Sequence, residues 1–167
     1  AQIVGFDGVD KRMDVLAAAI RAGLTAEQLT ELDLAYAPPY GSAKDPVNMA
    51  GYVIENVRAG LVEQHHWDVV AELPADGSVI LLDVRTPGEV RKQGLLRSDA
   101  LHIPLDELRG RLGELDKGKK VYVNCYSGLR SYLACRILSQ HGFRCSNLSG
   151  GWRFWSYNCL LYTSDAA

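Results

Sequence analysis

The stretch of sequence that decides the fold is residues 120–130, which read KVYVNCYSGLR. Its first half, residues 120–124, is rich in β-branched and aromatic residues and predicts a strand. Residues 131–140 are amphipathic and predict a helix that stops at Gly142. The residues between them, 125–130, therefore form a loop at the carboxyl end of a strand. In parallel α/β proteins, ligands bind at that end of the sheet.

Similar elements flank this central unit. Residues 79–84 (VILLDV) form an apolar, β-branched run that predicts a buried parallel strand, and residues 145–148 predict a third, short one. Residues 105–112 are expected to be helical, and Gly150 with Gly151 to form a turn. Strands that alternate with helices predict an α/β fold, with a parallel sheet flanked by helices on both sides.

Residues 1–60 have a different pattern and predict a helix-rich unit. Three short helices are expected there, with Asp10, Thr25 and Asp45 as their N-terminal caps. The segment 38–42 (PPYGS) separates the second helix from the third, and its two prolines exclude helix and central strand.

The charge balance and the apolar runs exclude two classes of partner. The chain has 18 Lys and Arg against 20 Asp and Glu, so no nucleic acid or anionic membrane is expected to bind. The run at residues 79–82 is the longest strongly apolar one and is too short to span a bilayer. The N-terminus has no secretion signal and no initiator Met, so the sequence is expected to begin inside a longer protein.

Cysteine usage points to a reducing compartment. The four cysteines form no CxxC pair and have no histidine at ligand spacing, so no metal site is expected. With no sign of export, free thiols and a cytoplasmic location are predicted.

The chemistry is expected at Cys125, the first residue of the loop. A loop that turns into a helix N-terminus directs backbone N–H groups inward, and these with the helix dipole stabilise a thiolate or a bound anion. An accessible thiolate beside the planar guanidinium of Arg130 suits nucleophilic attack and a covalent intermediate. The remaining loop residues that would surround the reacting atom are Tyr126, Ser127, Gly128 and Leu129. The alternative is an inert buried thiol, which is the interpretation for Cys135 and Cys145.

Two charged residues lie at the end of the strand expected at residues 79–84. Asp83 and Arg85 could form a surface ion pair, or they could brace the cysteine loop from the neighbouring strand end. We favour the bracing role.

Residues from about 66 to 155 resemble a single-copy rhodanese domain. The segments that carry the resemblance are 82–89 (LDVRTPGE), 103–108 (IPLDEL), 125–131 (CYSGLRS) and 148–152 (LSGGW). The resemblance implies that Cys125 carries a transferred sulfane sulfur as a persulfide, and that Asp83 and Arg85 help to hold the loop. One segment departs from the family, because residues 94–100 (GLLRSDA) replace its usual Gly-His-Ile-Pro-Gly-Ala stretch.

Residues 1–60 resemble the C-terminal dimerisation domain of the pyridine nucleotide–disulfide oxidoreductases, and most closely that of the coenzyme A-disulfide reductases. Segments 8–12, 32–40 and 43–48 carry this resemblance. It implies a homodimeric parent that uses FAD and NAD(P)H, with coenzyme A as a further ligand. Tyr40, and also Tyr36, would approach the redox site of the partner subunit, with interface or core packing as the alternative. No GxGxxG occurs in this chain, so none of these cofactors is expected to bind here alone.

The expected division of the chain follows from both resemblances. Residues 1–60 belong to the truncated dimerisation domain, 61–66 are a linker, and 67–155 form the rhodanese domain. Residues 156–167 are expected to be a non-native tail, because residues 160–164 (LLYTS) resemble a translated sequencing adaptor.

The resulting hypothesis is a sulfur-handling domain of a coenzyme A-disulfide, persulfide or polysulfide reductase, with a sulfane-sulfur donor or persulfide as its substrate. Two alternatives stay open. One is a phosphatase or arsenate reductase, whose loops have one residue more than the four that separate Cys125 from Arg130. The other is a non-catalytic docking module with the same fold.

Overall fold

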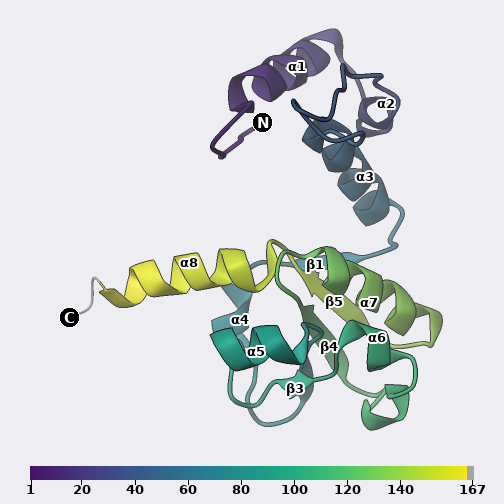
Figure 1. Ribbon diagram of the computed structural model, residues 1–167. Helices are drawn as coiled ribbons and strands as arrows, with labels where there is room; N and C mark the ends of the chain where they lie inside the picture. Colours follow the sequence, from purple (N-terminus) through teal and green to yellow (C-terminus); the bar gives the residue numbers. More distant parts are fainter. Residues whose placement is uncertain (165–167) are drawn as a thin grey trace. The chain divides into compact units, whose positions relative to one another are not determined.

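The computed structural model describes the backbone of residues 1–164 and the side chains of residues 1–158. The chain folds as two compact units, residues 1–60 and the residues from Leu61 onward (Figure 1). Each unit has its own packing and is described separately.

The second unit is built on a five-stranded sheet in which every pair of neighbours is parallel. The strand order is β1-β5-β4-β2-β3, so β4 lies at the centre. The strands are β1 (Glu63–His65), β2 (Val79–Asp83), β3 (Leu101–His102), β4 (Lys120–Asn124) and β5 (Cys145–Leu148). The α/β fold with a parallel sheet is therefore confirmed.

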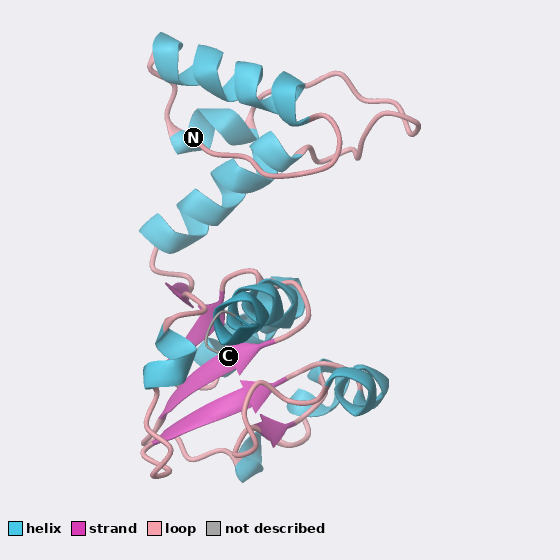
Figure 2. Ribbon diagram, turned by 90° about the vertical axis from the view of Figure 1, so that its left-hand side faces the viewer, coloured by secondary structure: helices cyan, strands magenta, loops and turns pink. Residues whose placement is uncertain are grey.

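Helices cover both faces of this sheet (Figures 1 and 2). The helices are α4 (Val69–Glu72), α5 (Pro87–Gln93), α6 (Leu105–Leu108), α7 (Leu129–Gln140) and α8 (Gly151–Ser164), with a 3-10 turn, η1, at Leu112–Glu114. On one face, side chains of α6 and α7 pack against Leu82, Val121 and Val123. On the other face, side chains of α4 and α8 pack against Leu81 and Leu148. Successive strand residues thus enter opposite cores, as the two-residue period of a strand requires.

Several elements of this unit differ from expectation. The expected linker, residues 61–66, contains β1, which pairs with β5 and extends the sheet. Its three residues are Glu, Gln and His, so nothing apolar marked it as a strand. The helix expected over 105–112 ends at Leu108 and gives way to η1, in a stretch where Gly110 and Gly113 weaken helix propensity. Helix α8 runs past residue 155, the expected domain limit, to Ser164.

The first unit contains α1 (Val9–Ala22), α2 (Ala26–Thr30) and α3 (Pro46–Arg58), and no strand forms within residues 1–60. Thr25 and Asp45 cap α2 and α3 as predicted. The predicted helix forms as α1, but its predicted cap was wrong, because Gly8 is the N-cap and Asp10 lies in the first turn. Gly8 takes the left-handed conformation, at φ 62°, and its carbonyl accepts a hydrogen bond from Arg12.

Close contacts between side chains and backbone hold the three helices of this unit together. The Arg12 guanidinium pairs with Asp45 at 3.1 Å and so connects α1 to the cap of α3. Gly51 of α3 lies so close to α2 that a Cβ atom there would be 2.8 Å from the carbonyl oxygen of Ala26. The α2–α3 contact therefore requires glycine at this position.

Candidate functional site

The sulfur of Cys125 lies inside the loop that joins β4 to α7. It accepts a hydrogen bond from the backbone N–H of Gly128, with N and Sγ 3.1 Å apart, and one from the Ser131 hydroxyl at 3.2 Å. Gly128 is the N-cap of α7 and has φ 102°, a left-handed value that favours glycine. The loop therefore turns sharply enough to bring an amide back onto the sulfur.

Cys125 is fully buried, at 0% exposure, so the expectation of an accessible thiol is wrong. The reason is that the turn before α8 packs tightly on the loop. The Cys125 carbonyl accepts a hydrogen bond from the Trp152 amide at 2.7 Å, and the Tyr126 carbonyl accepts one from Arg153 at 3.0 Å. A Cβ atom on Gly151 would lie 2.5 Å from the Cys125 carbonyl oxygen, so only glycine permits this approach.

Arg130 does not point a free guanidinium at the loop. It makes a two-pronged ion pair with Glu89 of α5, at 2.6 and 2.8 Å. Hydrogen bonding to Arg130 lowers the pKa of Glu89 to about 2. The same contact raises the pKa of Arg130, and Cys125 and Asp83 add smaller effects. Glu89 also accepts hydrogen bonds from the Thr86 amide and hydroxyl in the capping box of α5. Both Arg130 and Thr86 therefore fix the position of its carboxylate.

Asp83 and Arg85 form an ion pair with no exposed surface on either side chain. The Arg85 Nη2 and Asp83 Oδ2 atoms are 2.6 Å apart, and the Arg85 amide also donates to the Asp83 carboxylate. Further donors of Arg85 reach the side chain of Gln93 and the carbonyl of Gly94 at the end of α5. The pair is therefore not a surface ion pair.

Trp152 links this ion pair to the cysteine loop. The guanidinium of Arg85 lies 5.2 Å from the centre of the Trp152 ring, and this ring stacks on Tyr126 at 6.3 Å. The backbone amide of Trp152 donates to the Cys125 carbonyl. On the opposite side, the carbonyl of Arg85 contacts His102 Nε2 at 2.8 Å. A continuous series of contacts thus runs from Asp83 to Cys125.

Four residues of the site were not predicted: Glu89, Ser131, Trp152 and Asn124. The Thr86–Glu89 spacing is a capping-box signal and could have revealed Glu89. Asn124 precedes Cys125 and is fully buried, yet neither end of its side-chain amide has a hydrogen-bond partner among residues 1–158. The indole N–H of Trp152 is buried and unpaired in the same way.

Cys135 belongs to α7 and Cys145 to β5, so neither is part of the loop itself. Cys135 and Cys145 are buried, and the Cys145 thiol donates to the Cys135 carbonyl at 3.4 Å. Contact with Cys145 and burial together raise the pKa of the Cys135 thiol. Among the residues whose side chains are described, no group of His, Cys, Asp and Glu could hold a metal ion. The side chain of Cys159 lies outside the described residues.

Tyr36 and Tyr40 belong to the first unit, where their side chains are 53% and 84% exposed. Neither is therefore a core residue of that unit. Within the described part of the chain, no helix is long and apolar enough to cross a membrane.

Comparison with known proteins places this geometry in a family. Residues 66–158 match the rhodanese-like domain, three residues past the limit of 155 expected from the sequence. A sulfurtransferase from Allochromatium vinosum is 43% identical over 83 residues, which are 49% of this chain and 76% of that protein. Coenzyme A disulfide reductase from Staphylococcus aureus is 56% identical over 52 residues, 31% of this chain and 12% of the reductase.

Two solved structures resemble the chain over most of its length. One is reduced Bacillus anthracis CoADR-RHD, with 45% identity, a TM-score of 0.83, and coverage of 89% of this chain and 26% of that one. The other is a NAD-dependent persulfide reductase from A. fulgidus, with 42% identity, a TM-score of 0.77, and coverage of 90% and 26%. This chain thus spans about a quarter of each of these proteins. The match over more than half of its residues shows that the chain belongs to the rhodanese-like family.

Proposed function

We propose that Cys125 forms a persulfide and that this chain is the sulfur-handling part of an FAD- and NAD(P)H-dependent coenzyme A-disulfide, persulfide or polysulfide reductase. The observation that carries the proposal is the pair of donors on the Cys125 sulfur, one from the Gly128 amide and one from the Ser131 hydroxyl. Hydrogen bonds to a charged acceptor are the stronger ones, so both donors stabilise a thiolate more than a thiol.

The transfer step balances without an added oxidant. The Cys125 thiolate attacks the outer sulfur of a donor persulfide, R–S–SH, and a new sulfur–sulfur bond forms. The bond between the two donor sulfurs breaks, and R–S⁻ leaves with its electron pair. The product is Cys125–S–SH. Since the cysteine has no exposed surface, the donor reaches it only when side chains or backbone of the loop shift.

The contacts behind the loop support a bracing role for Asp83 and Arg85. Arg85 holds the Trp152 ring, and Trp152 holds both the Cys125 carbonyl and the Tyr126 ring. Loss of this support would let the loop drift from the geometry in which the Gly128 amide faces the sulfur. The amides of Tyr126, Ser127, Leu129 and Arg130 complete the proposed cradle for the outer sulfur.

The similarity to the coenzyme A disulfide reductase and to the persulfide reductase supports a larger parent enzyme. FAD and NAD(P)H, with coenzyme A as the thiol ligand, would be held by domains of the parent that this chain does not contain. In the cytoplasm, NAD(P)H and FAD would supply the electrons that reduce the sulfur delivered by Cys125.

We also propose that the parent is a homodimer. One face of α3 carries half-exposed Met49, Val53, Ile54 and Val57, and Tyr40 with Tyr36 would lie near the partner's redox site.

A sulfur-transfer assay tests the proposal directly. The chain is incubated with thiosulfate or glutathione persulfide, and transfer of sulfane sulfur to cyanide is measured. We expect transfer by the wild-type chain, none by Cys125→Ser, and full transfer by Cys145→Ala. Hydrolysis of an aryl phosphate that depends on Cys125, without sulfur transfer, would favour the phosphatase hypothesis instead. A chain with neither activity would be a docking module.

A further inference from the structure

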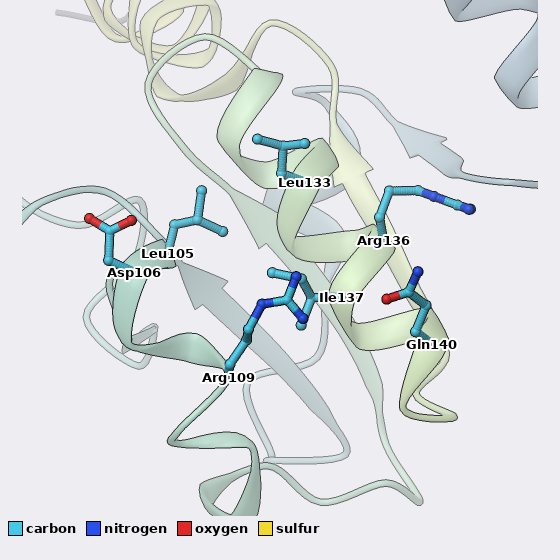
Figure 3. Close-up of a pocket in the computed structure, with 7 residues that line it drawn as sticks. All are labelled: Leu105, Asp106, Arg109, Leu133, Arg136, Ile137 and Gln140. Atoms are coloured by element: carbon cyan, nitrogen blue, oxygen red, sulfur yellow. The ribbon is translucent and has the colours of Figure 1, made fainter.

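Cys125 is fully buried, and the groove beside α7 does not lead to it. This groove has a volume of about 420 Å³ and lies between α6 and α7 (Figure 3). Its lining residues come from α6, the C-cap of α6 and α7, and none of them belongs to residues 125–131. A route to the sulfur therefore has to open elsewhere. The segment that packs on the cysteine loop is residues 149–153, which we call the covering turn.

The covering turn is held on the loop by backbone hydrogen bonds that water can replace. The Trp152 amide donates to the Cys125 carbonyl at 2.7 Å, and the Arg153 amide donates to the Tyr126 carbonyl at 3.0 Å. Both amides lie in the first turn of α8, where an amide has no acceptor within its own helix. If the turn lifts, water can bond to these amides and to the loop carbonyls. Opening therefore breaks two hydrogen bonds without leaving their groups buried.

Two adjacent glycines connect the covering turn to the end of β5. Gly150 and Gly151 have φ values of 75° and 60°, in the left-handed region that favours glycine. The closed position requires glycine for a second reason, because a Cβ atom on Gly150 would lie 2.6 Å from the Cβ atom of Phe154. Glycine also reaches other backbone conformations at little steric cost. Rotation at these two residues therefore costs less than rotation at residues that carry a side chain.

The closed turn leaves polar groups buried without partners. Neither end of the Asn124 side-chain amide has a hydrogen-bond partner among residues 1–158, and the same is true of the Trp152 indole N–H. The two side chains lie on one face of the sheet. Asn124 is two strand positions after Tyr122, and Tyr122 and Trp152 pack against the same core. A buried polar group without a partner raises the free energy of the state in which it is buried.

We propose that the covering turn is a lid that pivots at Gly150 and Gly151 to expose Cys125, and that Asn124 sets how often it opens. Opening gives the Asn124 amide and the Trp152 indole N–H access to water, so these groups disfavour the closed state alone. Asn124 is thus a positioning residue that acts on the lid. The inference rests on the proposed function, since it identifies the movement that lets a sulfur donor reach the cysteine.

Hydrogen exchange measures the lid without any sulfur transfer. The amides of Trp152 and Arg153 exchange when the lid opens, whereas amides in the middle of β4 report unfolding of the whole unit. Asn124→Leu replaces the unpaired amide by an apolar side chain of similar size. We expect exchange at Trp152 and Arg153 to slow about tenfold, with no loss in the free energy of unfolding. Alkylation of Cys125 by iodoacetamide at constant pH, followed on its own peptide, should slow by the same factor.

Two further variants make the test specific to the lid. Asn147→Leu is the matched control, because Asn147 is also a buried asparagine of the sheet with an unpaired side-chain oxygen, and it lies on β5 outside the lid. It should leave exchange at the lid unchanged. Gly150→Ala strains the closed backbone and crowds Phe154. Exchange at the lid and alkylation of Cys125 should therefore become about tenfold faster, with exchange in β4 unchanged.

The outcomes that would overturn the inference differ from those that concern the proposed function. Faster or unchanged exchange at Trp152 in Asn124→Leu, or a loss of stability, would show that the amide is already satisfied in the closed state, for example by a buried water. Gly150→Ala with wild-type rates, or Asn147→Leu with the same slowing as Asn124→Leu, would also contradict the lid. If the lid responds as expected but Cys125 accepts no sulfur from a persulfide donor, the proposed function fails instead.

Discussion

The hydroxyl oxygen of Ser131 lies 3.2 Å from the sulfur of Cys125 and 3.1 Å from the carbonyl oxygen of Gly128. A hydroxyl has one proton, so these two acceptors compete for it. A thiolate is the stronger acceptor because it is charged. Ionisation of Cys125 therefore draws the Ser131 proton toward the sulfur, and the serine responds directly to the state of the nucleophile.

Replacing Ser131 by alanine removes this donor from a fully buried site. We expect the rate of persulfide formation on Cys125 to fall about tenfold, since a hydrogen bond to a charged group contributes roughly 1.5 kcal/mol or more. Stopped-flow kinetics with a persulfide donor would measure it. Ser131→Thr keeps the hydroxyl and should recover most of the rate, whereas Ser139→Ala should leave it unchanged. A Ser131→Ala chain as fast as wild type would exclude this role.

The Asp83–Arg85 pair should be necessary for stability. Arg85→Met leaves the Asp83 carboxylate buried without its partner, which costs ~3–5 kcal/mol when a buried pair is broken. Urea unfolding of the chain would show this loss. The matched control is Arg111→Met, because its pairs with Glu107 and Glu114 are largely exposed to solvent and should contribute little to stability. Equal effects of the two substitutions would mean that burial of the Asp83–Arg85 pair has no special consequence.

Glu89 is expected to hold Arg130 away from bound oxyanions. Glu89→Gln removes the charge but keeps an N3 residue that can complete the capping box with Thr86. With Arg130 released, KM for thiosulfate should fall severalfold, because a free guanidinium forms two-pronged hydrogen bonds with an oxyanion. Steady-state kinetics with thiosulfate and with a neutral persulfide would show the effect for thiosulfate alone. An unchanged or higher KM for thiosulfate would indicate that Arg130 does not bind the oxyanion.

The lowered pKa of His65 predicts how the stability of the folded chain depends on pH. Burial, with a smaller effect from Lys120, lowers the pKa of His65 from 6.5 to about 4. Between these values the unfolded chain binds a proton that the folded chain does not, so stability is greatest above pH 6.5 and falls as the pH drops toward 4. The loss from this group is roughly 2–3 kcal/mol at pH 4.5.

The measurement for His65 is urea unfolding of the wild-type chain and of His65→Gln at pH 7 and at pH 4.5. Glutamine lacks the titrating group and can still bond to the Ser146 hydroxyl, which His65 Nδ1 contacts at 3.0 Å. The variant should therefore lose less stability than the wild type between the two pH values. A parallel loss in both proteins would show that other groups govern the acid response.

The sequence predicts the parts of the fold whose signals are local. The strands β2, β4 and β5 are apolar and β-branched or follow clear turn residues, and the caps Thr25 and Asp45 are visible in the residue types. Strands β1 and β3 were missed because they are short edge strands, and Glu63–His65 is polar. Such strands exist only because a neighbour supplies their hydrogen bonds.

The candidate site can be divided in the same way, into features that the local sequence predicts and features that it does not. Cys125 and the loop follow from the strand–loop–helix pattern, and the Asp83–Arg85 pair follows from its place at a strand end. The partner of Arg130 and the burial of Cys125 do not, since both depend on residues distant in the sequence, Glu89 and Gly151. Long-range contacts of this kind leave no periodic signal along the chain.

The most direct test of the account is a mass measurement on the chain after incubation with a persulfide donor and removal of excess reagent. The account predicts one added sulfur atom, located by peptide mapping on the segment that contains Cys125, and no addition in Cys125→Ser. The added sulfur should disappear when cyanide is supplied. An unmodified Cys125, or an added sulfur found only on Cys135 or Cys145, would contradict the claim that Cys125 is the sulfur carrier.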